Sequence, residues 1–280
     1  MFRKLLKNEF KSSFFDFMII YAVIIFTGLI SGIIIRFDIN SKHNLYVYVI
    51  LLYILVFFAA IILILKNIIM SFYKKMFDKQ GYLTFTLPVS TNQIILSKLI
   101  VNFLWVIFSF LVLTLSGIIV FLISSEQSIE ILKTVFNEVY LQLEKFGLLR
   151  ADLIILYSIV GLVGIIIGLE YLLVILSLLN IGKFKKHKFI KGILIFIVFN
   201  FVINIISSII LIIFPYFIGI ELKEQGLVGK LQIYSLSNIL NSEVAIIPII
   251  FLGQIILMII ELVAFYLISK VLIEKKLELE

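Results

Sequence analysis

The chain has 280 residues, of which 62% are hydrophobic, carries a formal net charge of +7 and contains no cysteine. Soluble globular domains are rarely so apolar, and a chain without cysteine has neither disulfides nor thiol chemistry. These values direct attention to segments that cross a membrane.

Long apolar stretches fill most of the chain, at residues 17–35, 45–65, 99–123, 153–181, 189–217 and 244–273. A helix rises about 1.5 Å per residue, so about 20 apolar residues cross about 30 Å of hydrocarbon. Backbone amides in lipid must bond within their own segment, which selects helices over strands. We predict an all-α integral membrane protein with six transmembrane helices, forming a single transmembrane domain over residues 1–280.

The basic residues are distributed unevenly between the two sides of this predicted bundle. Of the 24 Lys and Arg residues, 17 lie in segments 1–16, 66–98, 183–191 and 270–280. Short basic segments stay in the cytoplasm, so we expect both termini inside, 124–152 and 218–243 as extracellular loops, and a multi-pass location in the cell membrane. Attraction to anionic membrane lipid accounts for the positive charge, so we expect membrane lipid, and not nucleic acid, as a partner.

Residues 1–16 alternate between apolar and basic side chains with helical spacing. The apolar ones are Phe2, Leu5, Leu6, Phe10 and Phe14. This pattern predicts an amphipathic elbow helix that lies in the cytoplasmic interface before the first span. The alternative is a frayed basic tail that only sets the topology.

The cytoplasmic segment 66–98 is the most structured polar stretch. Its first part continues the second span as a helix, which we expect to end near Gly81. Apolar and polar residues then alternate over 83–87, which predicts an extended link ending at Pro88. Ser90 and Gln93 have the spacing of a capping box for the next helix. This arrangement favours a surface for a protein partner, and the alternative is an ordinary connecting loop.

The same segment resembles a known family. Residues 72–77 read FYKKMF, residues 81–90 read GYLTFTLPVS, and Gln93 and Lys98 follow at the start of the third span. This is similar to the type-2 permeases of ATP-binding-cassette exporters, whose Leu-rich stretch ends in Pro-Val-Ser before a Lys that opens the third span. The last residues, 274–280, are similar to the endings of low-GC Gram-positive members.

The resemblance implies a cytoplasmic coupling helix between spans two and three that docks on a separate ATPase subunit. By resemblance, this role falls on Tyr82, Leu83, Phe85, Leu87 and Pro88. It also implies that two copies, or one copy and a homologous permease, form the channel. ATP would be bound by the partner subunit.

Polar side chains inside the predicted spans form a second group of candidates. The carboxylates are Glu170 in span four and Glu261 in span six; the amides are Gln254, Asn200 and Asn204. A charge at this depth is costly, so each carboxylate should be protonated, paired or facing a cavity. The functional interpretation is a translocation route, and the structural one is interhelical hydrogen bonding that fixes the bundle.

Two further features of the spans predict packing. Gly164 and Gly168 form a Gly-x-x-x-Gly motif on the face of span four opposite Glu170. Trp105 in span three is most simply an interfacial aromatic anchor.

The sequence has no motif for catalysis. It contains no Walker sequence, so the chain has no ATPase site of that kind. Its two histidines, His43 and His187, stand alone in loops, so we expect no metal site and no cofactor. We therefore expect a transporter subunit and not an enzyme.

Three hypotheses remain open from the sequence. The first is the membrane-spanning permease of an ATP-driven exporter that moves an amphipathic antimicrobial peptide, an antibiotic or a lipid out of the cell. The second is an ion-coupled secondary transporter or channel that uses Glu170 and Glu261. The third is a non-transporting membrane immunity or assembly protein.

Overall fold

A computed structural model describes residues 2–38, 45–77, 88–124, 127–145, 151–180, 188–224 and 246–276, together with positions 81, 84 and 86. Within these residues the chain forms helices and turns, without strands. Six of the helices are long and apolar enough to cross a membrane. The predicted all-α fold is confirmed at this level, and the chain is a multi-pass membrane protein. The orientation of the termini stays a prediction.

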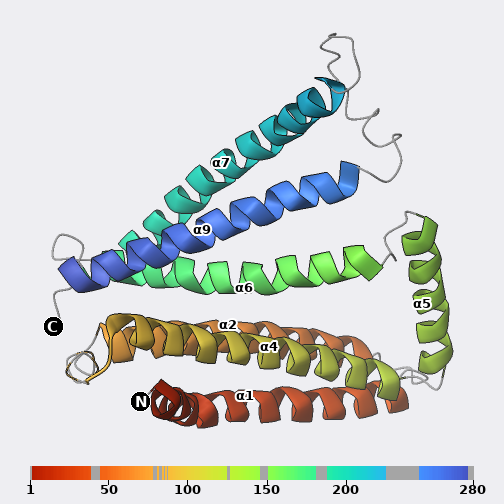
Figure 1. The fold of residues 1–280 in the computed structure, drawn as a ribbon. Helices are drawn as coiled ribbons and strands as arrows, with labels where there is room; N and C mark the ends of the chain where they lie inside the picture. Colours follow the sequence, from red (N-terminus) through yellow and green to blue (C-terminus); the bar gives the residue numbers. More distant parts are fainter. Residues whose placement is uncertain are drawn as a thin grey trace. The chain divides into compact units, whose positions relative to one another are not determined.

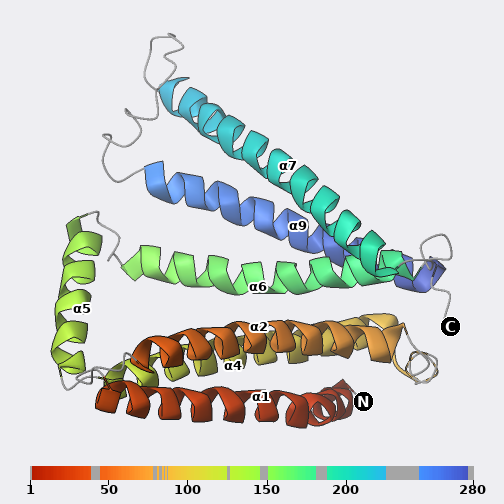
Figure 2. The same cartoon turned by 180° about the vertical axis from the view of Figure 1, so that it is seen from behind.

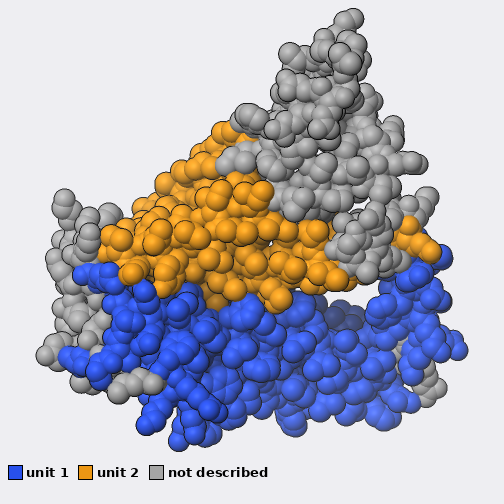
Figure 3. Space-filling view, in the orientation of Figure 1, with its two compact units in different colours: residues 1–142, 273–280 blue, residues 143–272 orange. Residues whose placement is uncertain are grey.

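The chain divides into two compact units, coloured separately in Figure 3. Unit 1 comprises residues 1–142 and 273–280, and unit 2 comprises residues 143–272. Each unit contains three of the long helices.

Unit 1 is built on helix α1 (Phe2–Asp38), which lies along α2 (Leu45–Met76) and α4 (Thr91–Ser124). Figures 1 and 2 show the three helices side by side along their length. The sequence allows this because the buried residues of α1 recur every three or four positions: Glu9, Ser13, Phe17, Ile20, Tyr21, Ile24, Ser31 and Ile35. Such a stripe presents one face of a helix to its neighbours.

The expected elbow helix over residues 1–16 is not a separate element, because α1 is one helix from Phe2 to Asp38. No glycine or proline breaks the chain before Gly28. The hydroxyls of Ser12 and Ser13 both donate to the carbonyl of Glu9, a contact that bends helices without ending them. The first turns of α1 are seen nearly end-on in Figure 1, out of line with the rest.

The start of α4 follows the predicted capping box. The backbone N–H of Gln93 donates to the side-chain oxygen of Ser90 at 3.4 Å and to its carbonyl at 2.9 Å. The extended link expected over residues 83–87 is wrong at Thr84, which has helical conformation, as does Gly81, where we expected the helix to end. Alternation over five residues does not separate a strand from a short helical turn.

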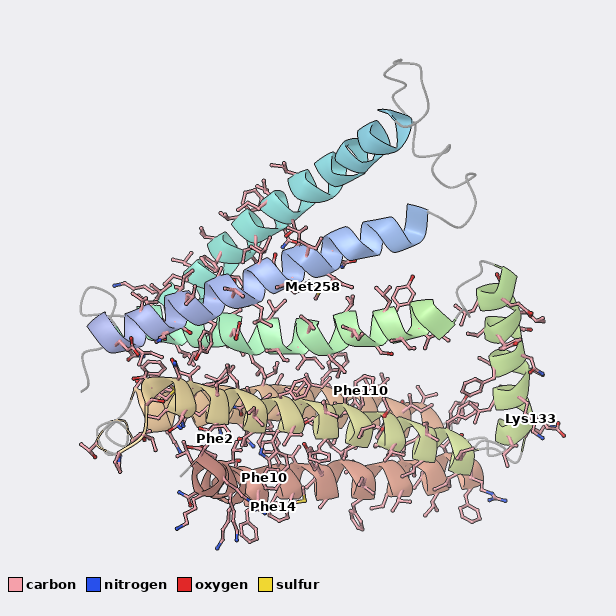
Figure 4. The ribbon with its side chains drawn as sticks, in the orientation of Figure 1. Phe2, Phe10, Phe14, Phe110, Lys133 and Met258 are labelled. Carbon is pink, nitrogen blue, oxygen red and sulfur yellow. The ribbon has the colours of Figure 1, made fainter. Side chains whose placement is uncertain are left out.

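The loop expected at residues 124–152 contains helix α5 (Ser128–Lys145), which the sequence reading missed. Apolar side chains such as Ile129, Phe136 and Val139 recur at helical spacing, with Glu130 on the opposite side, so the segment is amphipathic. These three apolar side chains are exposed. Figure 4 labels Lys133 on this helix.

Unit 2 contains α6 (Ala151–Leu179), α7 (Lys188–Glu224) and α9 (Ile246–Lys276). Figures 1 and 2 show them closest where α6 ends, α7 begins and α9 ends. Their shared core lies there, formed by Tyr171, Val174, Ile175, Leu179 and Phe265. Because α7 continues to Glu224, the loop expected at 218–243 begins inside a helix.

Candidate functional site: a polar seam between α1 and α4

Helix α4 presents a row of polar and aromatic residues to α1. The α4 members are Lys98, Asn102, Trp105, Ser109 and Ser116, all buried. Their spacings of three, four and seven residues place them on one face of the helix. They meet Glu9, Ser13 and Tyr21 of α1, as the following contacts show. We call these eight residues the polar seam.

The seam begins with a buried ion pair. Nζ of Lys98 lies 3.1 Å from Oε1 of Glu9, and the two side chains are 0% and 10% exposed respectively. Desolvating two charges is expensive, so such a pair adds little net stability compared with an apolar pair. Removing one partner, however, leaves a buried charge without compensation. The pair therefore fixes the register of the first turns of α4 against α1.

Trp105 lies at the centre of the seam. Its ring stacks between Phe10 and Phe17, with ring centroids 4.7 Å and 4.5 Å away. Its indole N–H donates to the side-chain oxygen of Ser13 at 3.0 Å. Trp105 is 1% exposed, so the interpretation as an interfacial anchor is wrong. A buried tryptophan needs a hydrogen-bond partner, and here Ser13 supplies it.

Hydroxyl groups continue the seam further along the helices. The hydroxyl of Tyr21 lies 2.7 Å from the Ser109 oxygen and 3.2 Å from the Trp105 carbonyl. Seven residues after Ser109 on α4, Ser116 donates to the carbonyl of Ile24 at 3.2 Å. The hydroxyl of Tyr53 in α2 also lies 2.7 Å from Ser116. Hydrogen bonds thus join the three long helices of unit 1, α1, α2 and α4.

Two glycines of α1 allow it to approach α4 closely near Ser116. A Cβ on Gly28 would lie 2.8 Å from Oγ of Ser116, and one on Gly32 would lie 2.9 Å from Cβ of Ile123. Gly28 and Gly32 form a Gly-x-x-x-Gly motif, the pattern that brings membrane helices together. The motif predicted at Gly164 and Gly168 does not have this role: a Cβ on Gly164 would make only an ordinary contact with Met258, and one on Gly168 would meet no described atom.

Asn102 is the unsatisfied member of the seam. It is fully buried, and neither its amide nitrogen nor its amide oxygen has a hydrogen-bond partner among the described residues. It lies one turn from Lys98 on the same face of α4. Buried polar atoms are costly without partners, so this position is suited to a bound water.

Unit 2 has its own polar contacts. The hydroxyl of Tyr171 donates to the carbonyl of Phe196 at 2.8 Å and accepts from the amide of Asn200 at 2.7 Å. These bonds join α6 to α7. Ser207 of α7 donates to Glu261 of α9 at 3.1 Å. Two predicted intramembrane residues, Asn200 and Glu261, therefore take part in interhelical hydrogen bonds.

Asn204, Glu170 and Gln254 make no hydrogen bond between helices among the described residues. The amide of Asn204 donates to the Asn200 carbonyl of its own helix. Oε2 of Glu170 has no hydrogen-bond partner in the described part of the chain. Gln254 is half-buried. The contacts seen among the candidates fit the structural interpretation, polar groups that hold a helix bundle together.

The predicted coupling residues Tyr82, Leu83, Phe85 and Leu87 lie outside the described residues, and Pro88 is exposed at a bend. Within the polar seam, Asn102, Ser109 and Ser116 share a face of α4 by their sequence spacing, whereas the pairing of this face with α1 was not predicted. One signal was Glu9, an acidic residue between the cations Lys7 and Lys11, together with Lys98. The Gly-x-x-x-Gly spacing of Gly28 and Gly32 was a second signal.

Within the described ranges, no group of three or more His, Asp or Glu side chains could hold a metal ion. Comparisons with protein-family models, curated proteins and solved structures found no match to this chain.

Proposed function

We propose that this protein is the membrane-spanning subunit of an ATP-driven exporter, powered by separate ATPase subunits. The resemblance of segment 72–98 to type-2 permeases motivates the proposal. The polar seam supports it, because a permease must convert movement at a cytoplasmic loop into movement of its helices. Six apolar helices suit a substrate that enters from lipid, such as an amphipathic peptide, an antibiotic or a lipid.

The seam supplies a path for that movement. Helix α4 starts at Thr91, directly after the segment proposed to bind the ATPase, and runs unbroken to Ser124. Lys98, in its second turn, is paired with Glu9, and Trp105 is held between two phenylalanines of α1. A displacement of the loop would therefore move α1 together with α4.

Two copies, or one copy with a homologous permease, would enclose the route. The second hypothesis, ion-coupled transport through Glu170 and Glu261, has less support because Glu261 already accepts a hydrogen bond from Ser207. A non-transporting immunity or assembly protein would also use a loop surface, so the experiment must separate these three.

The test is co-purification with the ATPase, followed by transport. Leu87→Asp and Phe85→Asp should abolish ATPase association without changing membrane insertion, since a charge is not tolerated in an apolar docking surface. Ser90→Asp is the matched control: it adds the same charge nearby, and Asp caps a helix as well as Ser. Unchanged association in both loop variants would contradict the coupling role.

Transport assays in vesicles then separate the hypotheses. Nucleotide-dependent export that persists with a protonophore supports the exporter. Export that needs no nucleotide and stops with a protonophore supports the ion-coupled transporter. ATPase binding without any export supports the non-transporting protein.

A further inference from the structure

A groove runs along unit 1 between the first turns of α1 and the start of α4. The groove is open along one side and has a volume of about 550 Å³, within the range of small-molecule binding sites. Both helices contribute apolar side chains to it, including Phe10 and Phe14 from α1 and Leu104 from α4. Figure 4 labels Phe10 and Phe14 on α1.

Three cations follow one edge of this groove. Arg3, Lys7 and Lys11 all line it, and all are exposed. They are spaced four residues apart, so they form one row along the helix, where like charges repel. No carboxylate lies within ion-pair distance of them in the described part of the chain, and the nearby Glu9 is paired with Lys98.

The cations of the groove all come from α1, where they alternate with apolar side chains, while the α4 residues that line it, Ile100, Val101 and Leu104, are all apolar. The cations precede the first apolar stretch of the chain, whereas Leu104 lies inside the third. A ligand that fills the groove therefore needs a negative head and an apolar tail. We propose that the groove binds an anionic phospholipid, with its phosphate at Arg3, Lys7 and Lys11 and an acyl chain against Phe10, Phe14 and Leu104. This site does not depend on the proposed transport function.

The fluorescence of Trp105 can report on binding at this groove. It is the only tryptophan of the chain, and it stacks on Phe10, which lines the groove. Trp105 itself is 1% exposed. Bromine atoms on an acyl chain in the groove would lie within quenching reach of the indole, whereas bulk lipid is kept at a distance.

The experiment reconstitutes the full chain into vesicles that contain either brominated phosphatidylglycerol or brominated phosphatidylcholine at the same mole fraction. Phosphatidylglycerol should quench Trp105 at lower mole fractions. Lys7→Gln and Lys11→Gln should each reduce this preference about fivefold, the effect of about one charge near an anionic lipid surface. Lys4→Gln is the control, because Lys4 is exposed in the same turns but does not line the groove.

Equal quenching by the two lipids in the unmodified protein would overturn the proposal. An equal loss in Lys4→Gln and the groove variants would do the same, since it would indicate general surface charge. Relief of quenching by millimolar glycerol 3-phosphate would identify a soluble phosphate as the ligand instead. A salt titration of the unmodified protein needs no variant: the preference should fall at 1 M NaCl, where the screening length is about 3 Å, and a preference independent of salt would contradict the site.

Discussion

The ion pair between Glu9 and Lys98 allows a quantitative test of the polar seam. The perturbations are Glu9→Gln, Lys98→Met and the two together. Glu9→Gln removes the carboxylate beside the Lys98 side chain, which is 0% exposed, whereas Lys98→Met leaves Glu9, which is 10% exposed and can be partly hydrated. The two single variants should therefore differ in their cost.

Removing one partner of a buried pair typically costs about 3–5 kcal/mol of stability. We expect Glu9→Gln to cost about 3 kcal/mol and Lys98→Met about 2 kcal/mol, since Glu9 is the less buried partner. The double variant leaves no charge behind and should lie within about 1 kcal/mol of the unmodified protein. The coupling free energy between the two sites would then be about 5 kcal/mol.

The assay is unfolding by sodium dodecyl sulfate in mixed micelles, followed by fluorescence of Trp105, whose stacking on Phe10 and Phe17 is lost when α1 and α4 separate. Lys4→Met is the control, because Lys4 is an exposed cation of the same helix and should change stability by no more than about 0.5 kcal/mol. The buried pair would be refuted if each single variant cost less than about 0.5 kcal/mol and the two costs simply added in the double variant.

Three further outcomes follow from the helix contacts. Gly32→Ala should destabilise the protein by about 1–3 kcal/mol, because its new Cβ would lie 2.9 Å from Cβ of Ile123. Gly161→Ala is the control: its Cβ meets no described atom, so it should be neutral or slightly stabilising. Equal melting temperatures for the two variants would contradict the close approach of α1 and α4. Tyr171→Phe should cost about 0.6–2 kcal/mol by removing two hydrogen bonds between α6 and α7, and no change in unfolding would count against them. Glu170→Gln should keep the fold because an amide and a protonated carboxyl are nearly isosteric, and a variant that fails to insert would disprove this.

Local features were predictable from the sequence when their cause is local. The start of α4 is an example, because Ser90 and Gln93 are three residues apart and the cap depends only on that spacing. Helix α5 was missed because polar residues interrupt it, although Ile129, Phe136 and Val139 keep a helical spacing. The elbow was predicted as a separate element on its amphipathic pattern, but nothing between Phe2 and Asp38 breaks the helix.

Pairing between helices was not predictable in the same way. The Gly164–Gly168 motif and the Gly28–Gly32 motif are equivalent as sequence patterns, yet only the second lies against another helix at less than 3 Å. A motif specifies a smooth face, and the partner that meets this face is specified elsewhere in the chain.

The sequence by itself determined the number of spans, because hydrocarbon thickness and backbone hydrogen bonding act on each segment separately. It also placed most of the positive charge in a few short segments. Only the tertiary structure decided that Glu9 pairs with Lys98, 89 residues away, and that Trp105 is a core residue of unit 1. These contacts depend on how one helix rotates about its axis against another, and in lipid that rotation is set by side-chain fit and not by the burial of apolar surface.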